Sequence, residues 1–128
     1  MTPSRPAWIL IVDDDPDVRE VVADALGTFP EMKVQTTSSG MEALACARAQ
    51  GFDVIITDAQ MPVMTGIDLL GHLRGEFPKI PVVMMSGDAI SRQRGVLGGA
   101  AGVLAKPFRT EHLTDLVFRL LDGSLAQR

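Results

Sequence analysis

The chain has 128 residues, a mass of 13.7 kDa and a formal net charge of −4, a size that fits one domain with a sizeable core. The acidic balance argues against a general nucleic-acid surface, so we expect no direct nucleic-acid binding. No apolar run approaches the ~18 residues of a membrane span, residues 1–6 lack a signal-peptide core, and a single cysteine, Cys46, excludes an intrachain disulfide, so we expect a cytoplasmic protein without membrane contact.

The first strand and helix are predicted directly after a short lead-in over residues 1–7. Trp8–Val12 is a continuous apolar run with β-branched residues, which is typical of a strand buried on both faces of a parallel sheet. Pro16 suits the first turn of a helix, and apolar residues at helical spacing follow it until Pro30. The chain therefore begins with a βα unit.

The middle of the chain repeats this alternation of strand and helix. Ser39 and Glu42 have the spacing of a capping box, which predicts a helix start just after a short strand. The predicted elements are a strand, a helix, a strand and a helix over residues 33–37, 39–50, 53–57 and 67–77.

The last third continues with a strand over Pro81–Met85 and a glycine-rich fourth helix near Ile90–Leu97. Each glycine in a helix interior costs ~1 kcal/mol relative to alanine, so we expect this helix to be short, frayed or partly irregular. Gly102–Ala105 predicts the fifth strand, and a clean amphipathic pattern from Thr110 to Gly123 predicts the last helix. The pattern predicts one α/β domain of five βα units over residues 8–122, with a tail over 123–128.

Four of the predicted strands stop at residues that can bind a cation or a phosphate. Asp13 and Asp14 follow the first strand, Asp58 ends the third, Ser86 ends the fourth and Lys106 ends the fifth. Because the carboxyl ends of parallel strands share one edge of the sheet, we expect these side chains to converge on one cleft.

The three carboxylates would repel one another in such a cleft. At ~4 Å and an effective dielectric of 20, each like-charge pair costs roughly 4 kcal/mol. Oxygen ligands without histidine or cysteine favour Mg²⁺, with Mn²⁺ as a substitute. The alternative is a solvated acidic loop in which Asp15 caps the following helix.

Lys106 and Ser86 are less specific when each is taken alone. A lysine at the mouth of an acidic cleft can neutralise phosphate, but it is also an ordinary surface residue. A hydroxyl at a strand end can donate to a phosphoryl oxygen, but it is also an ordinary turn residue. The combined spacing of all these positions is what indicates phosphate chemistry.

Four segments in this order resemble the receiver domains of two-component response regulators: ILIVDDDPDVRE, VIITDAQMPVMTG, PVVMMSGDA and GVLAKPF. The resemblance covers roughly residues 8–122. It implies a flavodoxin-like, CheY-like fold, in which a doubly wound parallel sheet of five strands has the order 2-1-3-4-5. It also implies a phosphorelay protein that accepts a phosphoryl group and is not otherwise an enzyme.

By this resemblance, Asp58 is the phosphoacceptor, and its donor is a phosphohistidine on a sensor histidine kinase or histidine phosphotransfer protein. Lys106 would pair with the phosphoryl oxygens or, at rest, with Asp58. Ser86 would move to the phosphate as the switch hydroxyl, and Pro107 would follow a cis peptide bond.

The resemblance also implies how the cation is held. Asp14, Asp58 and the backbone carbonyl of Gln60 would ligate Mg²⁺ directly, while Asp13 would act mainly through bound water. Gln60 and Asp88 would tune the lifetime of the phosphate, because both flank the path of an attacking water.

The chain departs from the family pattern on its signalling side. The family commonly carries an aromatic residue three positions before the lysine, where this chain has Val103, so an aromatic rotamer switch is excluded there. The segment between Ser86 and Lys106 is about two residues shorter than usual. We therefore expect signalling through ordering of the fourth helix, towards an output partner or domain that the sequence does not identify.

Two further expectations concern contacts between proteins. In the family, the face formed by the fourth helix, the fifth strand and the last helix usually carries the signal. We expect that a homodimer could form through this face. Phe118 lies off the apolar stripe of the last helix, so it is either an interface contact or an aromatic residue at the edge of the core.

Two other functions remain as alternatives. One is a binding-only pseudo-receiver that has lost phosphorylation. The other is a small phosphatase of the haloacid-dehalogenase type, with Asp13 as nucleophile and Asp15 as acid/base. The latter family needs an acidic pair beyond the lysine, and the acidic residues after Lys106 all fall in or at the end of a predicted helix.

Overall fold

A computed structural model describes residues 5–126 of the chain. Five strands alternate with five helices along the chain. The strands are β1 (Ala7–Val12), β2 (Met32–Thr37), β3 (Val54–Asp58), β4 (Val82–Ser86) and β5 (Gly102–Ala105). The helices are α1 (Pro16–Gly27), α2 (Gly40–Ala49), α3 (Gly66–Glu76), α4 (Ala89–Leu97) and α5 (Thr110–Ala126).

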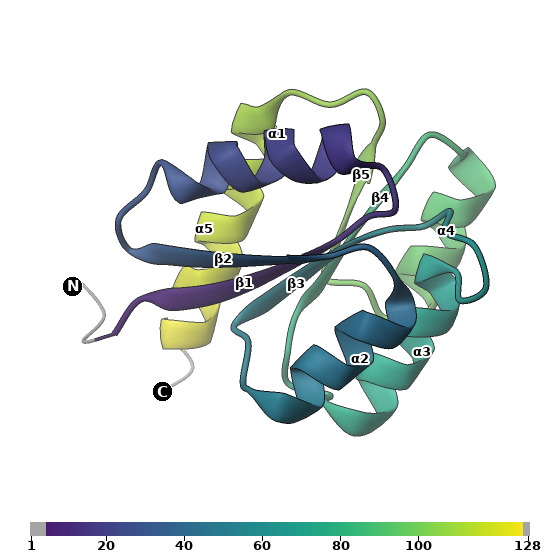
Figure 1. Ribbon diagram of the computed structural model, residues 1–128, viewed down its shortest axis with the longest axis horizontal. Helices are drawn as coiled ribbons and strands as arrows, with labels where there is room; N and C mark the ends of the chain where they lie inside the picture. The colour runs from purple at the N-terminus through teal and green to yellow at the C-terminus, as the bar shows by residue number, and fades with distance from the viewer. Residues whose placement is uncertain (1–4, 127–128) are drawn as a thin grey trace.

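All neighbouring strands pair in parallel, in the order β2-β1-β3-β4-β5, which confirms the predicted topology. Helices α1 and α5 cover one face of the sheet, and α2, α3 and α4 cover the other (Figure 1). The order reverses at β1, so the carboxyl ends of β1 and β3 lie side by side at the point where open α/β sheets bind ligands.

The core has two apolar layers because each central strand is buried on both faces. Leu10 and Val12 of β1 pack towards α2 and α3, whereas Ile9 and Ile11 pack towards α1 and α5. All four side chains are fully buried. This burial explains why the strand is continuously apolar rather than alternating.

Side-chain caps fix where the helices begin. Ser39 accepts a hydrogen bond from the Glu42 N–H at the start of α2, as predicted, although the Glu42 carboxylate contacts Ser38 instead of closing a full capping box. The complete capping box lies at α3, where Thr65 and Asp68 accept from each other's backbone N–H. Thr65 and Asp68 are thus the residues in the sequence that mark the start of α3.

Two predicted boundaries are wrong at the ends of the domain. Strand β1 begins at Ala7, whose N–H donates to the Glu31 carbonyl, one residue before the predicted start at Trp8. Helix α5 passes through the predicted end at Gly123 and continues to Ala126, and residues 127–128 lie outside the described part. One glycine costs only ~1 kcal/mol of helix stability, which does not end a helix by itself.

Helix α4 is short, as its glycines predict, yet it is regular over its nine residues and capped by Asp88. It ends at Gly98 and Gly99, and Gly99 has the positive φ of 95° that favours glycine. Gly95 is buried against Met84 and Val103. Within residues 5–126, no helix combines the length and hydropathy required to cross a membrane.

Candidate functional site

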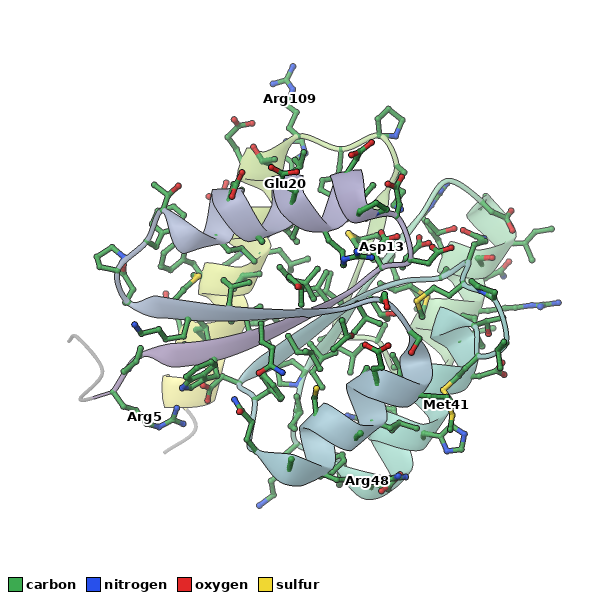
Figure 2. All side chains as sticks on the ribbon, viewed as in Figure 1. Arg5, Asp13, Glu20, Met41, Arg48 and Arg109 are labelled. Carbon is green, nitrogen blue, oxygen red and sulfur yellow. The ribbon has the colours of Figure 1, made fainter. Side chains whose placement is uncertain are left out.

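The carboxyl ends of the strands bring the predicted residues together. Asp58 and Ser86 are the last residues of β3 and β4, whereas Asp13 and Lys106 directly follow β1 and β5. Figure 2 shows Asp13 where β1 turns towards α1. Residues that lie up to 93 positions apart in the sequence, such as Asp13 and Lys106, thus meet at one edge of the sheet.

Asp13 is the most deeply buried carboxylate of this edge. Its side chain is fully buried, its Oδ1 accepts the Asp15 N–H at 3.0 Å, and its Oδ2 lies 3.2 Å from the Lys106 Nζ. Burial raises the pKa of Asp13, and the charge of Asp58 adds to this effect. The hydrogen bond from the Asp15 N–H and the charge of Lys106 oppose this rise in the pKa.

Lys106 joins two of the carboxylates. Its Nζ lies 3.0 Å from Asp58 Oδ1 and 3.2 Å from Asp13 Oδ2. Burial lowers the pKa of Lys106, but the hydrogen bond to Asp58 and the negative charges of Asp13 and Asp58 outweigh burial and raise it overall. The ammonium group therefore stays charged beside the acidic residues at neutral pH.

The acidic residues form a set that fits a small hard cation. Ligand atoms of Asp13, Asp14 and Asp58 lie within 4.8 Å of one another. Asp14 is exposed, while Asp13 and Asp58 are buried, so the set opens to solvent on one side. Carboxylate oxygens with an open side suit Mg²⁺, which binds through one or two carboxylates and keeps several waters.

Asp15 does not join this set, because it has a structural role. Its side chain accepts the Asp17 N–H at 2.9 Å and caps α1. The alternative of a helix cap thus holds for Asp15 alone among the three consecutive aspartates, while Asp13 and Asp14 lie with Asp58.

Ser86 is fully buried at the end of β4 and is held by hydrogen bonds. Its Oγ accepts the Asp88 N–H at 3.0 Å and lies 3.2 Å from Gln60 Oε1 and 3.3 Å from the Asp88 carbonyl. Arg92 of α4 donates to the Ser86 carbonyl at 2.9 Å. Sequence reasoning missed the contacts of Gln60 and Arg92 with Ser86, because motif spacing does not reveal which side chains meet in the fold.

Gly66 is a further residue that the motifs did not single out. A Cβ at this position would overlap the Asp58 carbonyl oxygen, and the Gly66 N–H donates to the Ala59 carbonyl at 2.9 Å. Only glycine permits this approach of α3 to the end of β3. The signal available in the sequence was the Thr65-Gly66 pair at a helix start.

Three remaining predictions concern residues around the site. The peptide bond between Lys106 and Pro107 is cis, as the resemblance implies. Val103 is half-buried against the layer that α4 covers. Phe118 is half-buried and packs edge-to-face on Phe29, with ring centroids 4.9 Å apart, which places it at the edge of the core. An interface role for Phe118 stays a prediction.

Comparison with known families gives one match that spans most of the chain. The model for the response regulator receiver domain matches residues 9–118. A probable transcriptional regulatory protein of Mycobacterium tuberculosis, TcrX, is 36% identical over 118 residues, which are 91% of this chain and 49% of the relative. The chain thus spans about half the length of that relative.

Shorter relatives match along nearly their whole length. Chemotaxis protein CheY-3 of Vibrio cholerae is 32% identical over 118 residues, which cover 89% of this chain and 91% of that protein. The crystal structure of the chemotaxis response regulator CheY4 of Vibrio cholerae superposes with a TM-score of 0.83 at 37% identity, covering 91% of this chain and 99% of the other.

Proposed function

This chain belongs to the response regulator receiver family, and from that premise we propose that Asp58 accepts a phosphoryl group from a phosphohistidine. The donor is a sensor histidine kinase or a histidine phosphotransfer protein. An Asp58 carboxylate oxygen forms the new bond to phosphorus as the nitrogen–phosphorus bond breaks. The electron pair of that bond stays on the imidazole, which leaves as a neutral group once protonated.

The observation that supports this role most directly is the 3.0 Å contact between the Lys106 Nζ and Asp58 Oδ1. It holds a cation beside the oxygen that would carry the phosphoryl group. Phosphoryl transfer depends mainly on positioning and on neutralising charge, and Lys106 supplies both. The lysine remains beside the product, where it pairs with the phosphoryl oxygens.

The acidic set would hold Mg²⁺ through Asp14, Asp58 and the backbone carbonyl of Gln60, with Asp13 acting through water; Mn²⁺ is a substitute. When bound, the ion supplies positive charge to the transferring phosphoryl oxygens. Asp13 itself orients Lys106, because the two share a 3.2 Å contact in a buried setting.

The product would be read by Ser86, whose hydroxyl donates to the phosphoryl oxygen. The resulting change would reach a partner or output domain through α4, β5 and α5, a face that also serves for a homodimer. Catalysis by the chain is limited to its own phosphorylation and dephosphorylation, and Gln60 and Asp88 set the phosphate lifetime. A cytoplasmic location accords with a kinase donor.

The contacts of Asp15 count against the phosphatase alternative. Its carboxylate is used as the cap of α1, where it accepts the Asp17 N–H at 2.9 Å. An acid/base residue must instead reach the leaving group.

The test is acetyl phosphate with Mg²⁺, followed by intact mass measurement. We expect an adduct of about 80 Da on the natural chain and on Asp17→Asn, an exposed carboxylate control, but none on Asp58→Asn. Absence of the adduct from the natural chain would favour a pseudo-receiver. Turnover of p-nitrophenyl phosphate that survives Asp58→Asn and is lost in Asp13→Asn would favour the phosphatase.

A further inference from the structure

The side-chain amide of Gln60 connects two elements that the sequence keeps far apart. Its Oε1 lies 3.2 Å from Ser86 Oγ at the end of β4, and its Nε2 lies 3.0 Å from Ser91 Oγ in the first turn of α4. We call this Ser86–Gln60–Ser91 connection the Gln60 bridge. Gln60 itself is exposed, in a cleft of about 630 Å³ between the loop after β3 and α4.

The directions of these hydrogen bonds are fixed by the far end of the bridge. Ser91 Oγ lies 2.9 Å from Asp88 Oδ2, and this hydrogen bond is the main cause that lowers the pKa of Asp88. An ionised carboxylate can only accept hydrogen bonds, so the Ser91 hydroxyl donates to Asp88. Ser91 Oγ must therefore accept from the Gln60 amide. Gln60 then presents its oxygen to Ser86, whose hydroxyl donates to it at 3.2 Å and has the Asp88 carbonyl as a second acceptor at 3.3 Å.

Ser86 has one proton, and a phosphoryl oxygen on Asp58 would compete for it. Phosphoryl oxygens at neutral pH are strong acceptors, so the Ser86 hydroxyl cannot serve Gln60 and the phosphate together. We propose that the Gln60 bridge holds the first turn of α4 in the unphosphorylated protein and that loss of the Ser86 proton to the phosphoryl group releases it. The release step rests on the proposed function, whereas the holding step does not.

Movement of the hydroxyl would also affect the cap of α4. The Asp88 N–H donates to Ser86 Oγ at 3.0 Å, and Asp88 is the N-cap residue of α4. Rotation of Ser86 towards Asp58 leaves this N–H without its acceptor. The Arg92 side chain donates to the backbone carbonyl of Ser86, so this contact survives rotation of the Ser86 side chain. The change is therefore confined to the first turn.

The bridge gives this chain a route to α4 that needs no aromatic residue at Val103. It acts by loosening the first turn, which is the opposite of the ordering expected from the sequence. Gly95 lets α4 lie against Val103 and Met84, so that part of the helix is fixed by packing. The first turn, by contrast, is exposed at Asp88 and Ile90 and is held by polar contacts. It is therefore the part of α4 that one hydrogen bond can loosen.

The holding step is tested by amide hydrogen exchange of Asp88 and the first turn of α4 in the unphosphorylated protein. The bridge is removed by Gln60→Met, which lacks the amide, and by Ser91→Ala, which lacks the hydroxyl in α4. Ser86→Ala removes the hydroxyl at the β4 end of the bridge. We expect about fivefold faster exchange in Gln60→Met, as for loss of one net hydrogen bond. Ser91→Ala and Ser86→Ala should exchange faster still, because each also loses a contact with Asp88. Adding Gln60→Met to Ser91→Ala should cause no further increase. Gln93→Ala, an exposed change on the same helix, is the matched control.

The release step is tested by adding Mg²⁺ and beryllium fluoride, a phosphoryl mimic. We expect it to speed exchange about fivefold in the natural chain and in Gln93→Ala. In Gln60→Met the increase should be confined to the Asp88 amide, which loses its Ser86 acceptor without the bridge. Exchange in Gln60→Met equal to that of Gln93→Ala would overturn the bridge. A beryllium fluoride adduct without faster exchange would overturn release alone, and a missing adduct would count against the proposed function and release together.

Discussion

Gly95 of α4 and Val103 of β5 lie so close that a Cβ added at position 95 would stand 3.3 Å from Val103 Cγ1. The same Cβ would stand 2.9 Å from Met84 Sδ, inside the fully buried part of the sheet. The small side chain at position 103 and the glycine at position 95 thus belong to one packing arrangement. Helix α4 rests directly on β4 and β5, where a large ring would need space.

This packing predicts opposite effects for the same substitution in two helices. Gly95→Ala should lower the free energy of unfolding by about 1 kcal/mol, because overpacking outweighs the gain in helix propensity. Gly71→Ala in α3 should raise it by about 0.5–1 kcal/mol, since a Cβ there meets nothing within 4 Å. Urea unfolding of both variants measures the difference in the free energy of unfolding. Equal effects would contradict the close packing of α4 on β4 and β5.

Binding of Mg²⁺ should appear as a gain in thermal stability that depends on Asp14. At ten times its Kd, an ion stabilises the folded state by about 1.4 kcal/mol, or roughly 4 °C in Tm. Asp14→Asn should abolish most of this shift, because Asp14 belongs to the acidic set, whereas Asp17→Asn should keep it, because Asp17 does not. Excess EDTA should return the natural chain to its metal-free Tm; a shift shared by all three proteins would indicate binding elsewhere.

Asp13 and Lys106 should change stability in opposite directions when the metal is absent. Asp13→Asn removes a buried charge next to Asp58 while keeping an acceptor for the Asp15 N–H, so the free energy of unfolding should rise on the order of 1 kcal/mol. Lys106→Met leaves the carboxylates without their cation and should lower it on the order of 2 kcal/mol.

Denaturant unfolding in EDTA at neutral pH separates these two variants. Raising the Mg²⁺ concentration should reverse the advantage of Asp13→Asn, because the natural carboxylate then faces a cation. A loss of stability in Asp13→Asn without Mg²⁺ would show that the ion pair with Lys106 outweighs the cost of burying the charge.

Thr37 at the end of β2 offers a test outside the site. Its Oγ1 is buried and has no hydrogen-bond partner among residues 5–126. Thr37→Val keeps the shape and removes the unpaired hydroxyl, so it should raise the free energy of unfolding by about 1 kcal/mol. Thr36→Val, at the exposed neighbouring position, should change it by less than about 0.5 kcal/mol. A destabilised Thr37→Val would point to a water bound to this hydroxyl.

Much of the fold could be predicted because the local signals agree with one another. The apolar run ending at Val12 and the proline at Pro16 each mark a boundary by local chemistry alone. The end of α5 could not be placed, since Gly123 weakens a helix without stopping it. The start of α3 is marked by the capping box of Thr65 and Asp68, which became evident only in the structure.

The sequence by itself determined which residues meet at the carboxyl edge. Parallel strands carry whatever follows them to one side of the sheet, so the positions of Asp13, Asp58, Ser86 and Lys106 follow from strand order and period. Only the tertiary structure decided what those groups do to one another. Three contacts depend on side-chain orientation and packing distance, which a pattern along the sequence does not show: those of Lys106, those of the Gln60 bridge and the packing of Gly95 on β4 and β5.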